Sequence, residues 1–328
     1  MANEVEKYNA LALSDIEKIN GFADDDIEKL NGFEFTGTIP VNGIFAFGHT
    51  DAGHLGMSNL VNTSGVVATD VTAVGTARRE LGACEYGTGT AIFAYGNGGA
   101  DSNLVSTSGV IASDLTAVGT NRNGISGAAY GGDKGIFAFG SSSYGVFVTT
   151  RNLVNNSGVI ASDATGAGTA RSELGACEYG TQTAIFAYGF TTGSPYKHSV
   201  SNLVNSSGVV ASDTSGVGSA RYHVKGGAYG GDKGFFTGGR TAASATWDRT
   251  NLVSNSGVVA SDVSAVGTQV EGPGVTQYGS GTAIKAFGHP ASGYTAISHL
   301  YSDSGVESAD VSGVGTARAR LAGASWHS

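Results

Sequence analysis

Cysteine, proline and charge are all scarce in this sequence. Its 328 residues include 2 Cys and 4 Pro, and charged residues make up 14% of the chain. No apolar run reaches the roughly 18 residues that a membrane-spanning helix needs. Two cysteines allow at most one disulfide, which excludes a small disulfide-stabilised scaffold. We therefore expect a chain that folds around a large hydrophobic core and does not cross a membrane.

The charges that are present also exclude some partners. The formal net charge is −9 and the Lys and Arg residues are scattered, which disfavours binding to the phosphates of a nucleic acid. The N-terminus has no basic start followed by an apolar run, so we expect no secretory signal and synthesis in a cytoplasm. With so little charge, the surface must be covered by Ser, Thr and Asn, a composition that suits a particle exposed to the outside.

Glycine is abundant, with 53 residues, and it belongs to a repeat. The element Asn-Leu-Val recurs with spacings of 44 to 50 residues, at Asn59, Asn103, Asn152, Asn202 and Asn251, with His299-Leu300-Tyr301 as a divergent sixth copy. Periods of about 40 to 50 residues are typical of propeller blades and helical solenoids. Short apolar runs between Gly, Ser and Asn, without the apolar spacing of a helix, favour strands.

Each copy predicts four short strands, which we name a to d. In one copy, strand a ends at 178–180, strand b is 184–189, strand c is 201–204 and strand d is 207–213. Strand b is apolar at every position, as in Ile185-Phe186-Ala187-Tyr188, which indicates burial on both faces. Such burial is expected where each sheet lies between two others. The predicted fold class is therefore all-β, a six-bladed β-propeller.

The first and last copies complement each other. The chain enters the repeat at a strand b, residues 44–47, and finishes with a lone strand a, residues 321–326. We expect these two segments to hydrogen-bond side by side, which would close the ring and leave no open sheet edge.

The order of these elements resembles the kelch repeat. An Arg, a small apolar strand and an apolar strand ending in Gly follow one another at Arg171, 176–180 and 185–189, and again at Arg221, 227–231 and 235–239. The resemblance covers residues 43–328 and implies a kelch-like β-propeller. The double glycine of that repeat occurs at Gly238-Gly239, whereas the Trp usual in its last strand is absent.

Residues 1–36 lie outside this repeat, ahead of the propeller region 37–328, and contain a shorter one. The segment 15–22 returns 11 residues later as 26–33. Its capping-box spacing and following Gly predict a short helical or extended arm. So short an element must pack on something, either the underside of the propeller or another protein. The apolar residues that would dock are Ile16, Ile19, Phe22, Ile27, Leu30 and Phe33.

This arm resembles segments at the start of structural proteins of tailed bacteriophages, particularly those of aquatic hosts. The match is carried by Ile16-Glu17-Lys18-Ile19-Asn20-Gly21 and its second copy, about 20 residues in all. The resemblance implies a virion protein that docks onto other virion proteins through the arm.

Asp and Arg recur in the copies eight residues apart, as at Asp70 and Arg78. We interpret them as structural, with Asp capping a turn and Arg bridging adjacent blades, because an active site is rarely copied into every blade. Asp262 is followed at this spacing by Val270, so the connection 271–274 should be rebuilt. Cys84 and Cys177 occupy equivalent positions in non-adjacent copies and are expected to be free and buried.

The connection between strands b and c varies most among the copies. These b–c loops, 50–57, 97–101, 141–151, 190–200, 240–250 and 290–298, should emerge on one rim of the ring. Loops that vary on a rigid scaffold commonly carry binding residues, and exposed aromatic rings suit sugars or a protein partner. The candidate binding residues are His54, Tyr144, Phe147, Tyr196, Lys197, His198, Trp247 and Tyr294. Surface decoration and packing between subunits are the alternative explanations.

Motifs that indicate catalysis are missing. The sequence has no Gly-x-Ser-x-Gly elbow, no P-loop and no Cys-x-x-Cys pair. His49, Asp51 and His54 are metal-ligand residue types, but their spacing is a weak indication. We therefore expect no enzyme activity, no cofactor and no metal.

Together these features predict a non-enzymatic structural protein of a phage virion, in a tail fibre, a baseplate or a capsid decoration, assembled in the host cytoplasm. Its b–c loops would face a host-surface glycan or protein or a neighbouring virion protein, and a homo-oligomer would gain avidity. Two alternatives stay open: a cellular kelch-like interaction module, and a propeller enzyme that acts on glycans.

Overall fold

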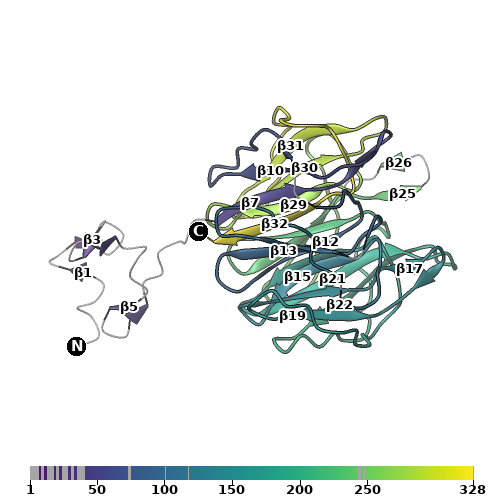
Figure 1. Ribbon diagram of the computed structural model, residues 1–328, viewed down its shortest axis with the longest axis horizontal. Coiled ribbons are helices and arrows are strands. Elements are labelled where there is room, and N and C mark those ends of the chain that lie inside the picture. Colours follow the sequence, from purple (N-terminus) through teal and green to yellow (C-terminus); the bar gives the residue numbers. More distant parts are fainter. Residues whose placement is uncertain are drawn as a thin grey trace. The chain divides into compact units, whose positions relative to one another are not determined.

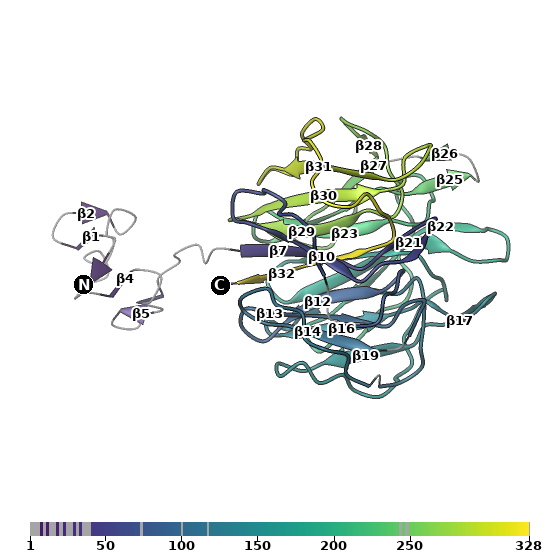
Figure 2. The same ribbon diagram turned by 45° about the horizontal axis from the view of Figure 1, so that its top comes forward.

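The computed structural model (Figures 1 and 2) describes residues 41–327 except 73–74, 100, 117, 243–244 and 247–248, together with six residue pairs of the N-terminal segment. Its contacts divide the chain into two compact units, Met1–Pro40 and Val41–Ser328. All regular elements among the described residues are β-strands. None of these residues forms a helix long and apolar enough to cross a membrane.

The described pairs of the N-terminal unit form three small antiparallel hairpins. They are β1 (Lys7–Tyr8) with β2 (Leu11–Ala12), β3 (Lys18–Ile19) with β4 (Phe22–Ala23), and β5 (Lys29–Leu30) with β6 (Phe33–Glu34). Their starts are 11 residues apart, so the short repeat has three copies. The first copy is hard to recognise in the sequence because Ala and Leu replace the Gly and Phe of the other two copies. It reads Val5-Glu6-Lys7-Tyr8-Asn9-Ala10-Leu11.

The expectation of helical turns in this arm is wrong for the described residues. Ile19 pairs with Phe22 and Leu30 pairs with Phe33, so two residues separate each pair. Those two residues are Asn-Gly in both copies, the dipeptide that two-residue hairpin connections favour most strongly. From the sequence alone, the same Gly was predicted to end a helix. Ile16 and Ile27, the other two docking residues, lie outside the described residues.

Within Val41–Ser328, the described residues form six antiparallel sheets of three or four strands. Sheet 1 contains β32 (Ala322–His327), β7 (Val41–Ala46), β10 (Met57–Val61) and β11 (Val71–Thr72); sheet 2 contains β12 (Gly82–Tyr86), β13 (Thr90–Ala94) and β14 (Ser102–Val105); sheet 3 contains β15 (Ser126–Tyr130), β16 (Lys134–Ala138) and β19 (Arg151–Val154); sheet 4 contains β20 (Gly175–Tyr179), β21 (Thr183–Phe190) and β22 (Lys197–Val204); sheet 5 contains β23 (Lys225–Tyr229), β24 (Lys233–Thr237), β27 (Arg249–Val253) and β28 (Val263–Ser264); and sheet 6 contains β29 (Gly274–Tyr278), β30 (Thr282–Gly288) and β31 (Thr295–Tyr301).

The two ends of the repeat region pair as the sequence predicted. Strand β32 is antiparallel to β7, in a register that runs from Ala322 opposite Ala46 to His327 opposite Val41. Figure 1 shows the two strands side by side in the first and last colours of the chain. Trp326 is buried at this seam and donates from Nε1 to the carbonyl of Thr107 in sheet 2, at 2.8 Å.

The first strands of the six sheets contact one another in cyclic order. β12 contacts β15, followed by β20, β23, β29 and β32, and β32 contacts β12 again. Backbone hydrogen bonds just before these strands follow the same cycle. The amide N of Glu80 donates to the carbonyl of Arg320. In the same way, the amide of Gly124 donates to Glu80, that of Glu173 to Gly124, that of Val224 to Glu173, that of Gly272 to His223 and that of Arg320 to Gly272.

The predicted strand d is only partly formed. In sheet 2 it makes isolated bridges, Val105 with Ile111 and Ser102 with Leu115, and not a continuous strand. Between these bridges the Asp114 carboxylate accepts hydrogen bonds from other parts of the chain. It accepts hydrogen bonds from Asn103 Nδ2 at 2.9 Å and from both Thr76 N and Thr76 Oγ1 at 2.8 Å.

A buried Arg joins neighbouring sheets in five of the six interfaces, as expected. Arg171 donates to Asn202 Oδ1 at 2.7 Å and to the carbonyl of Tyr188 at 2.6 Å within sheet 4. Its guanidinium also lies 4.5 Å from the ring centre of Phe139, at the end of sheet 3. Arg78, Arg122, Arg221 and Arg318 are buried over equivalent rings.

The Asp that each of two buried Arg residues faces is not the Asp that lies eight residues before it in the sequence. Arg171 faces Asp213 of its own sheet at 3.9 Å, and Arg318 faces Asp70 at 3.9 Å across the seam between the chain ends. The two cysteines are free and buried, as predicted, and burial raises the pKa of both thiols.

Candidate functional site

The b–c loops leave their sheets at the end of each strand b. Three of them carry small hairpins: β8 (His49–Thr50) with β9 (Gly53–His54), β17 (Ser141–Ser143) with β18 (Val146–Phe147), and β25 (Arg240–Ala242) with β26 (Ala245–Thr246). Val41, where the N-terminal segment joins, begins strand β7, whereas the b–c loop leaves the other end of that strand. The attachment point and the b–c loops therefore lie at opposite ends of sheet 1.

The described candidate binding residues lie on several of these loops. Tyr144 is 99% exposed and Tyr196 is 58% exposed. Lys197 donates to the carbonyl of Thr241 of the neighbouring loop, and His198 Nε2 lies 3.2 Å from Thr191 Oγ1. His54 is half-buried and opposes His49 in the β8–β9 hairpin. Trp247 lies outside the described residues.

Phe147 starts a row of aromatic rings that the sequence analysis did not foresee. Its ring centre is 6.0 Å from that of Phe190, which is 5.3 Å from that of Tyr222, which is 4.9 Å from that of His223. Phe147, Phe190 and Tyr222 are half-buried, whereas His223 is buried. The row thus leads from the b–c loop of sheet 3, over sheet 4, to the start of sheet 5.

Tyr294 forms a second group with the loop of sheet 1. Its hydroxyl donates to Asp51 Oδ1 at 3.0 Å, and its ring packs edge-to-face on His49 and on His289, with centres 5.5 and 5.1 Å apart. His49 Nδ1 lies 3.2 Å from the carbonyl of Ala319. Among the described residues, His49, Asp51 and His54 are not a group whose ligand atoms lie within 4.8 Å of one another.

A cluster of charged residues lies where the row of rings ends. Six residues with cyclic backbone hydrogen bonds lie just before the first strands of the six sheets, where the small cavities between those strands begin. We call them the mouth positions: Glu80, Gly124, Glu173, His223, Gly272 and Arg320. All six have φ between 55° and 60°, the left-handed region that glycine adopts most easily. Their sequence signal is position: each lies two residues after the repeated Arg, or after Val270 in sheet 6.

Ion pairs connect the mouth positions with their neighbours. Arg320 Nη1 lies 2.6 Å from Glu80 Oε1, and His223 Nε2 lies 3.1 Å from Glu173 Oε2. His223 Nδ1 lies 3.4 Å from Glu271 Oε2, and Arg240 holds the other oxygen of Glu271 at 3.0 Å. Glu80, Glu173 and His223 each offer one ligand atom within 4.8 Å of the others, so these residues could hold a metal ion.

Burial alone would lower the pKa of His223, but the Glu173 and Glu271 carboxylates that face its ring raise it above its ordinary value. Burial likewise favours the neutral form of Glu173, yet His223 lowers the pKa of that carboxyl. Lys225 lies beside this cluster at the start of β23, where burial lowers its pKa to about 8 against the attraction of Glu80 and Glu173.

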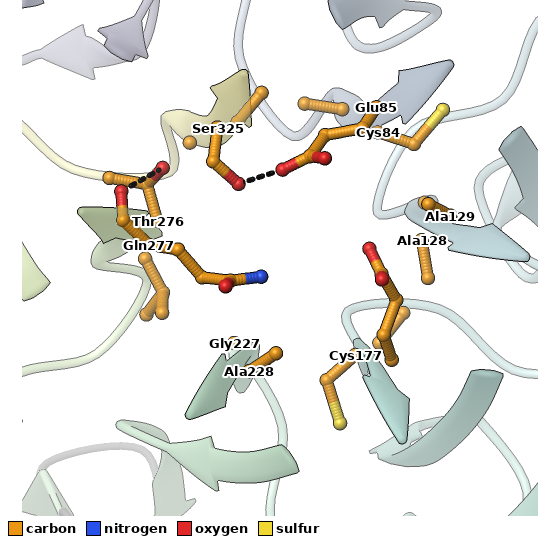
Figure 3. A pocket seen from close by; sticks show the side chains of 18 residues that line it. Cys84, Glu85, Ala128, Ala129, Cys177, Gly227, Ala228, Thr276, Gln277 and Ser325 are labelled. Atoms are coloured by element: carbon orange, nitrogen blue, oxygen red, sulfur yellow. Dashed lines mark hydrogen bonds between the residues drawn. The ribbon is translucent and has the colours of Figure 1, made fainter. Parts of the chain in front are cut away.

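Small cavities continue from the mouth between the six first strands. A cavity of about 20 Å³ lies among the mouth residues, one of about 30 Å³ is lined by Ser126 and Lys225, and one of about 60 Å³ lies beyond them. Figure 3 shows Glu85, Gln277 and Ser325 pointing into the last of these, with Ser325 donating to Glu85. Burial raises the pKa of Glu85 to about 7.

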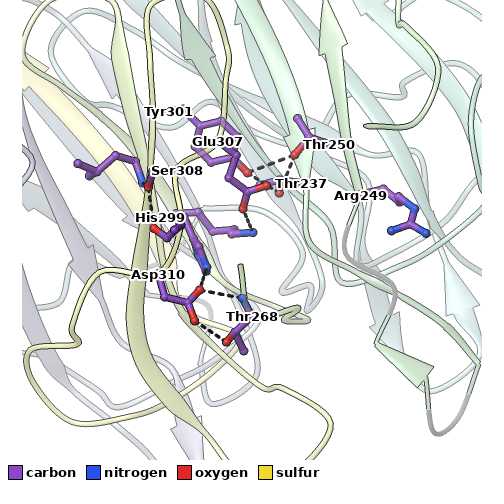
Figure 4. Close-up of polar contacts among 12 residues, drawn as sticks. Thr237, Arg249, Thr250, Thr268, His299, Tyr301, Glu307, Ser308 and Asp310 are labelled. Atoms are coloured by element: carbon purple, nitrogen blue, oxygen red, sulfur yellow. Dashed lines mark hydrogen bonds and ion pairs between the residues drawn. The ribbon is translucent and has the colours of Figure 1, made fainter. Parts of the chain in front are cut away.

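The interface between sheets 5 and 6 departs from the other five, and Figure 4 shows part of it. Lys285 occupies the position of a buried Phe in the other sheets and pairs with buried Glu307 at 2.6 Å. His299 replaces the repeated Asn and lies 2.7 Å from Asp310. The Tyr301 hydroxyl lies 2.9 Å from Thr237 Oγ1.

The connection 271–274, which was expected to be rebuilt, keeps the backbone of the other copies: Gly272 has a φ of 55°, like the equivalent positions, and Glu271 bridges His289 as Arg79 bridges Asn97. The differences lie instead in the side chains of this interface. Gly238 stands where other sheets have a ring for the Arg to cover, and a Cβ there would meet Pro273 at 2.9 Å. The Arg, its ring, the Asn and the buried Phe have thus been replaced together. All the replacements are buried, so we interpret this interface as packing and not as a binding site.

No protein-family model matches this sequence, and no curated protein is significantly similar to it.

Proposed function

We propose that this protein is a non-enzymatic, kelch-like six-bladed β-propeller of a tailed-phage virion, which binds a surface glycan through its b–c loops and docks onto other virion proteins through its N-terminal arm. The six sheets would be the blades. The cyclic contacts of the first strands, the cyclic backbone hydrogen bonds and the β7–β32 pairing all support a ring. A ring protects sheet edges and provides a rigid support for variable loops.

The observation that carries the glycan proposal is the aromatic row Phe147, Phe190 and Tyr222. The three half-buried rings lie on the b–c loop of sheet 3, at the end of β21 in sheet 4 and just before β23 of sheet 5, and they give an apolar strip with polar groups beside it. Lys197, His198 and Arg240 supply hydrogen-bond donors on the same or neighbouring loops. Sugar rings present apolar faces and hydroxyl edges, which match stacking on such rings combined with hydrogen bonding at their sides.

The position of the chain's attachment point supports display. The arm joins sheet 1 at the end opposite to the b–c loops. A protein held through that end leaves its b–c loops facing outward. The resemblance of the arm to the start of phage structural proteins is the reason for choosing a virion over a cellular kelch-like module.

The glycan proposal is tested by binding of the full chain to an array of purified bacterial surface polysaccharides. We expect at least one to bind, and Phe190→Ala and Tyr222→Ala to weaken that binding about tenfold, the equivalent of roughly 1.4 kcal/mol of lost stacking. Gln182→Ala is the matched control, because Gln182 is exposed at the opposite end of sheet 4. Unchanged binding of both aromatic variants would contradict the assignment of the site.

The same assay separates the glycan-active enzyme from the binding protein. We expect the bound polysaccharide to keep its length after prolonged incubation, as measured by size-exclusion chromatography. Shortening by the wild type but not by Glu173→Gln would instead establish an enzyme whose acid lies at the mouth.

The docking role of the arm is tested by comparing the full chain with a chain that begins at Gly37. We expect the shorter chain to keep its melting temperature, because Val41–Ser328 forms a compact unit of its own, and to lose self-association or incorporation into particles. Light scattering after size exclusion measures self-association. Identical behaviour of the two chains in both assays would remove the support for a docking arm.

A further inference from the structure

The mouth positions place three metal-ligand side chains together from three different sheets. Glu80 precedes sheet 2, Glu173 precedes sheet 4 and His223 precedes sheet 5, and their ligand atoms lie within 4.8 Å of one another. His223 Nε2 and Glu173 Oε2 are 3.1 Å apart. Two ligands of a tetrahedral zinc ion, each about 2.1 Å from the metal, are separated by about 3.4 Å, so this pair is already close to the required spacing.

The left-handed backbone conformation at these positions favours a functional role for their side chains. Gly124 and Gly272 occupy two of the six equivalent left-handed positions, where glycine is unstrained. Glu80, Glu173 and His223 adopt the same φ of 56° to 58° although a side chain disfavours it. Non-glycine residues held in this region concentrate at functional sites.

The residues around the three ligands are arranged as supports for a metal site. His223 directs Nε2 toward Glu173 and Nδ1 toward Glu271 Oε2, at 3.4 Å. A carboxylate facing the second ring nitrogen is the usual support of a metal-binding histidine. Arg240 holds Glu271 in turn. Arg320 and Arg79 both face Oε1 of Glu80, at 2.6 and 3.6 Å, so Oε2 is the oxygen available to an ion.

His223 is a second, independent indication of a ligand. Only 6% of this residue is exposed, and neither ring nitrogen has a hydrogen bond of acceptable geometry, although carboxylate oxygens lie within 3.4 Å of both. An ion placed between Nε2 and the Glu173 oxygen would satisfy the nitrogen. A cavity of about 20 Å³ adjoins the three residues, which is enough for one water molecule as a fourth ligand.

We propose that Glu80, Glu173 and His223 bind one divalent transition-metal ion of the zinc class at the mouth of the central channel. One imidazole nitrogen and two carboxylate oxygens suit zinc better than calcium, which takes six to eight oxygen ligands. Zn²⁺ binds the neutral imidazole, so binding releases any proton that His223 Nε2 carries. The ion joins sheets 2, 4 and 5 across the axis. This site does not depend on the proposed glycan binding.

The test is titration of the metal-stripped full chain with Zn²⁺, followed by calorimetry, with Ca²⁺ as a second probe. We expect one Zn²⁺ per chain, binding at least tenfold tighter than Ca²⁺, and a higher melting temperature of the zinc-loaded protein. Glu173→Gln and His223→Gln should each weaken Zn²⁺ binding at least tenfold. The melting temperature of each stripped variant shows whether it is folded.

Glu85→Gln is the matched control, because Glu85 is a carboxylate of the same channel that lies away from the mouth. We expect it to bind Zn²⁺ as the wild type does. The proposal is wrong if the wild type binds no Zn²⁺, since the cluster is then a set of ion pairs only. It is equally wrong if Glu173→Gln and His223→Gln bind as tightly as the wild type, or if Glu85→Gln is the variant that loses the ion.

Discussion

Replacing Arg171 by Val tests whether the buried Arg holds neighbouring sheets together. Arg171 donates three hydrogen bonds, to the carbonyls of Tyr188 and Thr169 and to Asn202 Oδ1, at 2.6 to 2.9 Å. Burial lowers its pKa to about 10, so the guanidinium is charged at neutral pH. Hydrogen bonds to a charged group contribute about 1.5–3 kcal/mol each. Part of this offsets the cost of burying the charge, so we expect Arg171→Val to destabilise the protein by about 3–5 kcal/mol.

Sheet 6 supplies the natural counterpart of this substitution. It has Val270 in place of the Arg and His299 in place of the Asn, and His299 reaches Asp310 at 2.7 Å. We therefore expect Asn202→His to recover at least about 1.5 kcal/mol in the Arg171→Val background, because the two residues occupy one space and are coupled. Asn202→His alone should be destabilising, since Arg171 then has no room.

Urea unfolding of the four proteins, the wild type, the two single variants and the double variant, measures this coupling. The reasoning is refuted if Arg171→Val lowers the free energy of unfolding by less than about 1 kcal/mol, or if the two substitutions are simply additive. Additivity would mean that the Val and His of sheet 6 arose independently.

Three further predictions concern stability. Trp326→Ala should lower the free energy of unfolding by about 3–5 kcal/mol, because it empties a buried site at the β7–β32 seam and removes the bond to Thr107; denaturant unfolding checks this, and a loss below about 1 kcal/mol would mean that the seam is not critical. Burial raises the pKa of Asp213, but hydrogen bonds from Thr169 and Asn202 and the charge of Arg171 lower it below 3.8 overall. Its stabilisation is therefore present above pH 3.8 and lost as the pH falls through the folded pKa, so between about pH 5 and pH 3 the wild type should lose more stability than Asp213→Asn. Finally, Glu307→Ile should destabilise by about 3–5 kcal/mol because it removes the carboxylate that pairs with Lys285, whereas Lys285→Phe/Glu307→Ile, the pair found in sheets 2 and 3, should be neutral or stabilising in thermal unfolding.

The N-terminal arm shows how a local pattern can be misread. Gly21 and Gly32 fit a helix stop, and they fit a two-residue hairpin turn equally well. The flanking pairs Ile19 with Phe22 and Leu30 with Phe33 decide for the hairpin in the structure. So few residues form each element that neither periodicity nor length favours one over the other.

The repeat alone determined much of the larger unit. A period of 44 to 50 residues, apolar strand b and the unmatched strands at the two ends are enough to predict the sheets, their order and the β7–β32 pairing. These features could be predicted because they depend on residues near one another in the sequence and on a pattern that occurs in six copies. The Arg that five of the six copies share, such as Arg171, was correctly assigned to structure for the same reason.

Only the tertiary structure decided which residues meet at the mouth. Glu80, Glu173 and His223 are far apart in the sequence, and although each lies two residues after the repeated Arg, that position holds Gly or Arg in the other copies, so the residue type there is not part of the repeat. They come together because the first strands of the six sheets contact one another in cyclic order, and these residues lie just before those strands. The aromatic row arises in the same way, since Phe147, Phe190 and Tyr222 belong to three successive sheets whose loops touch only after the sheets have packed.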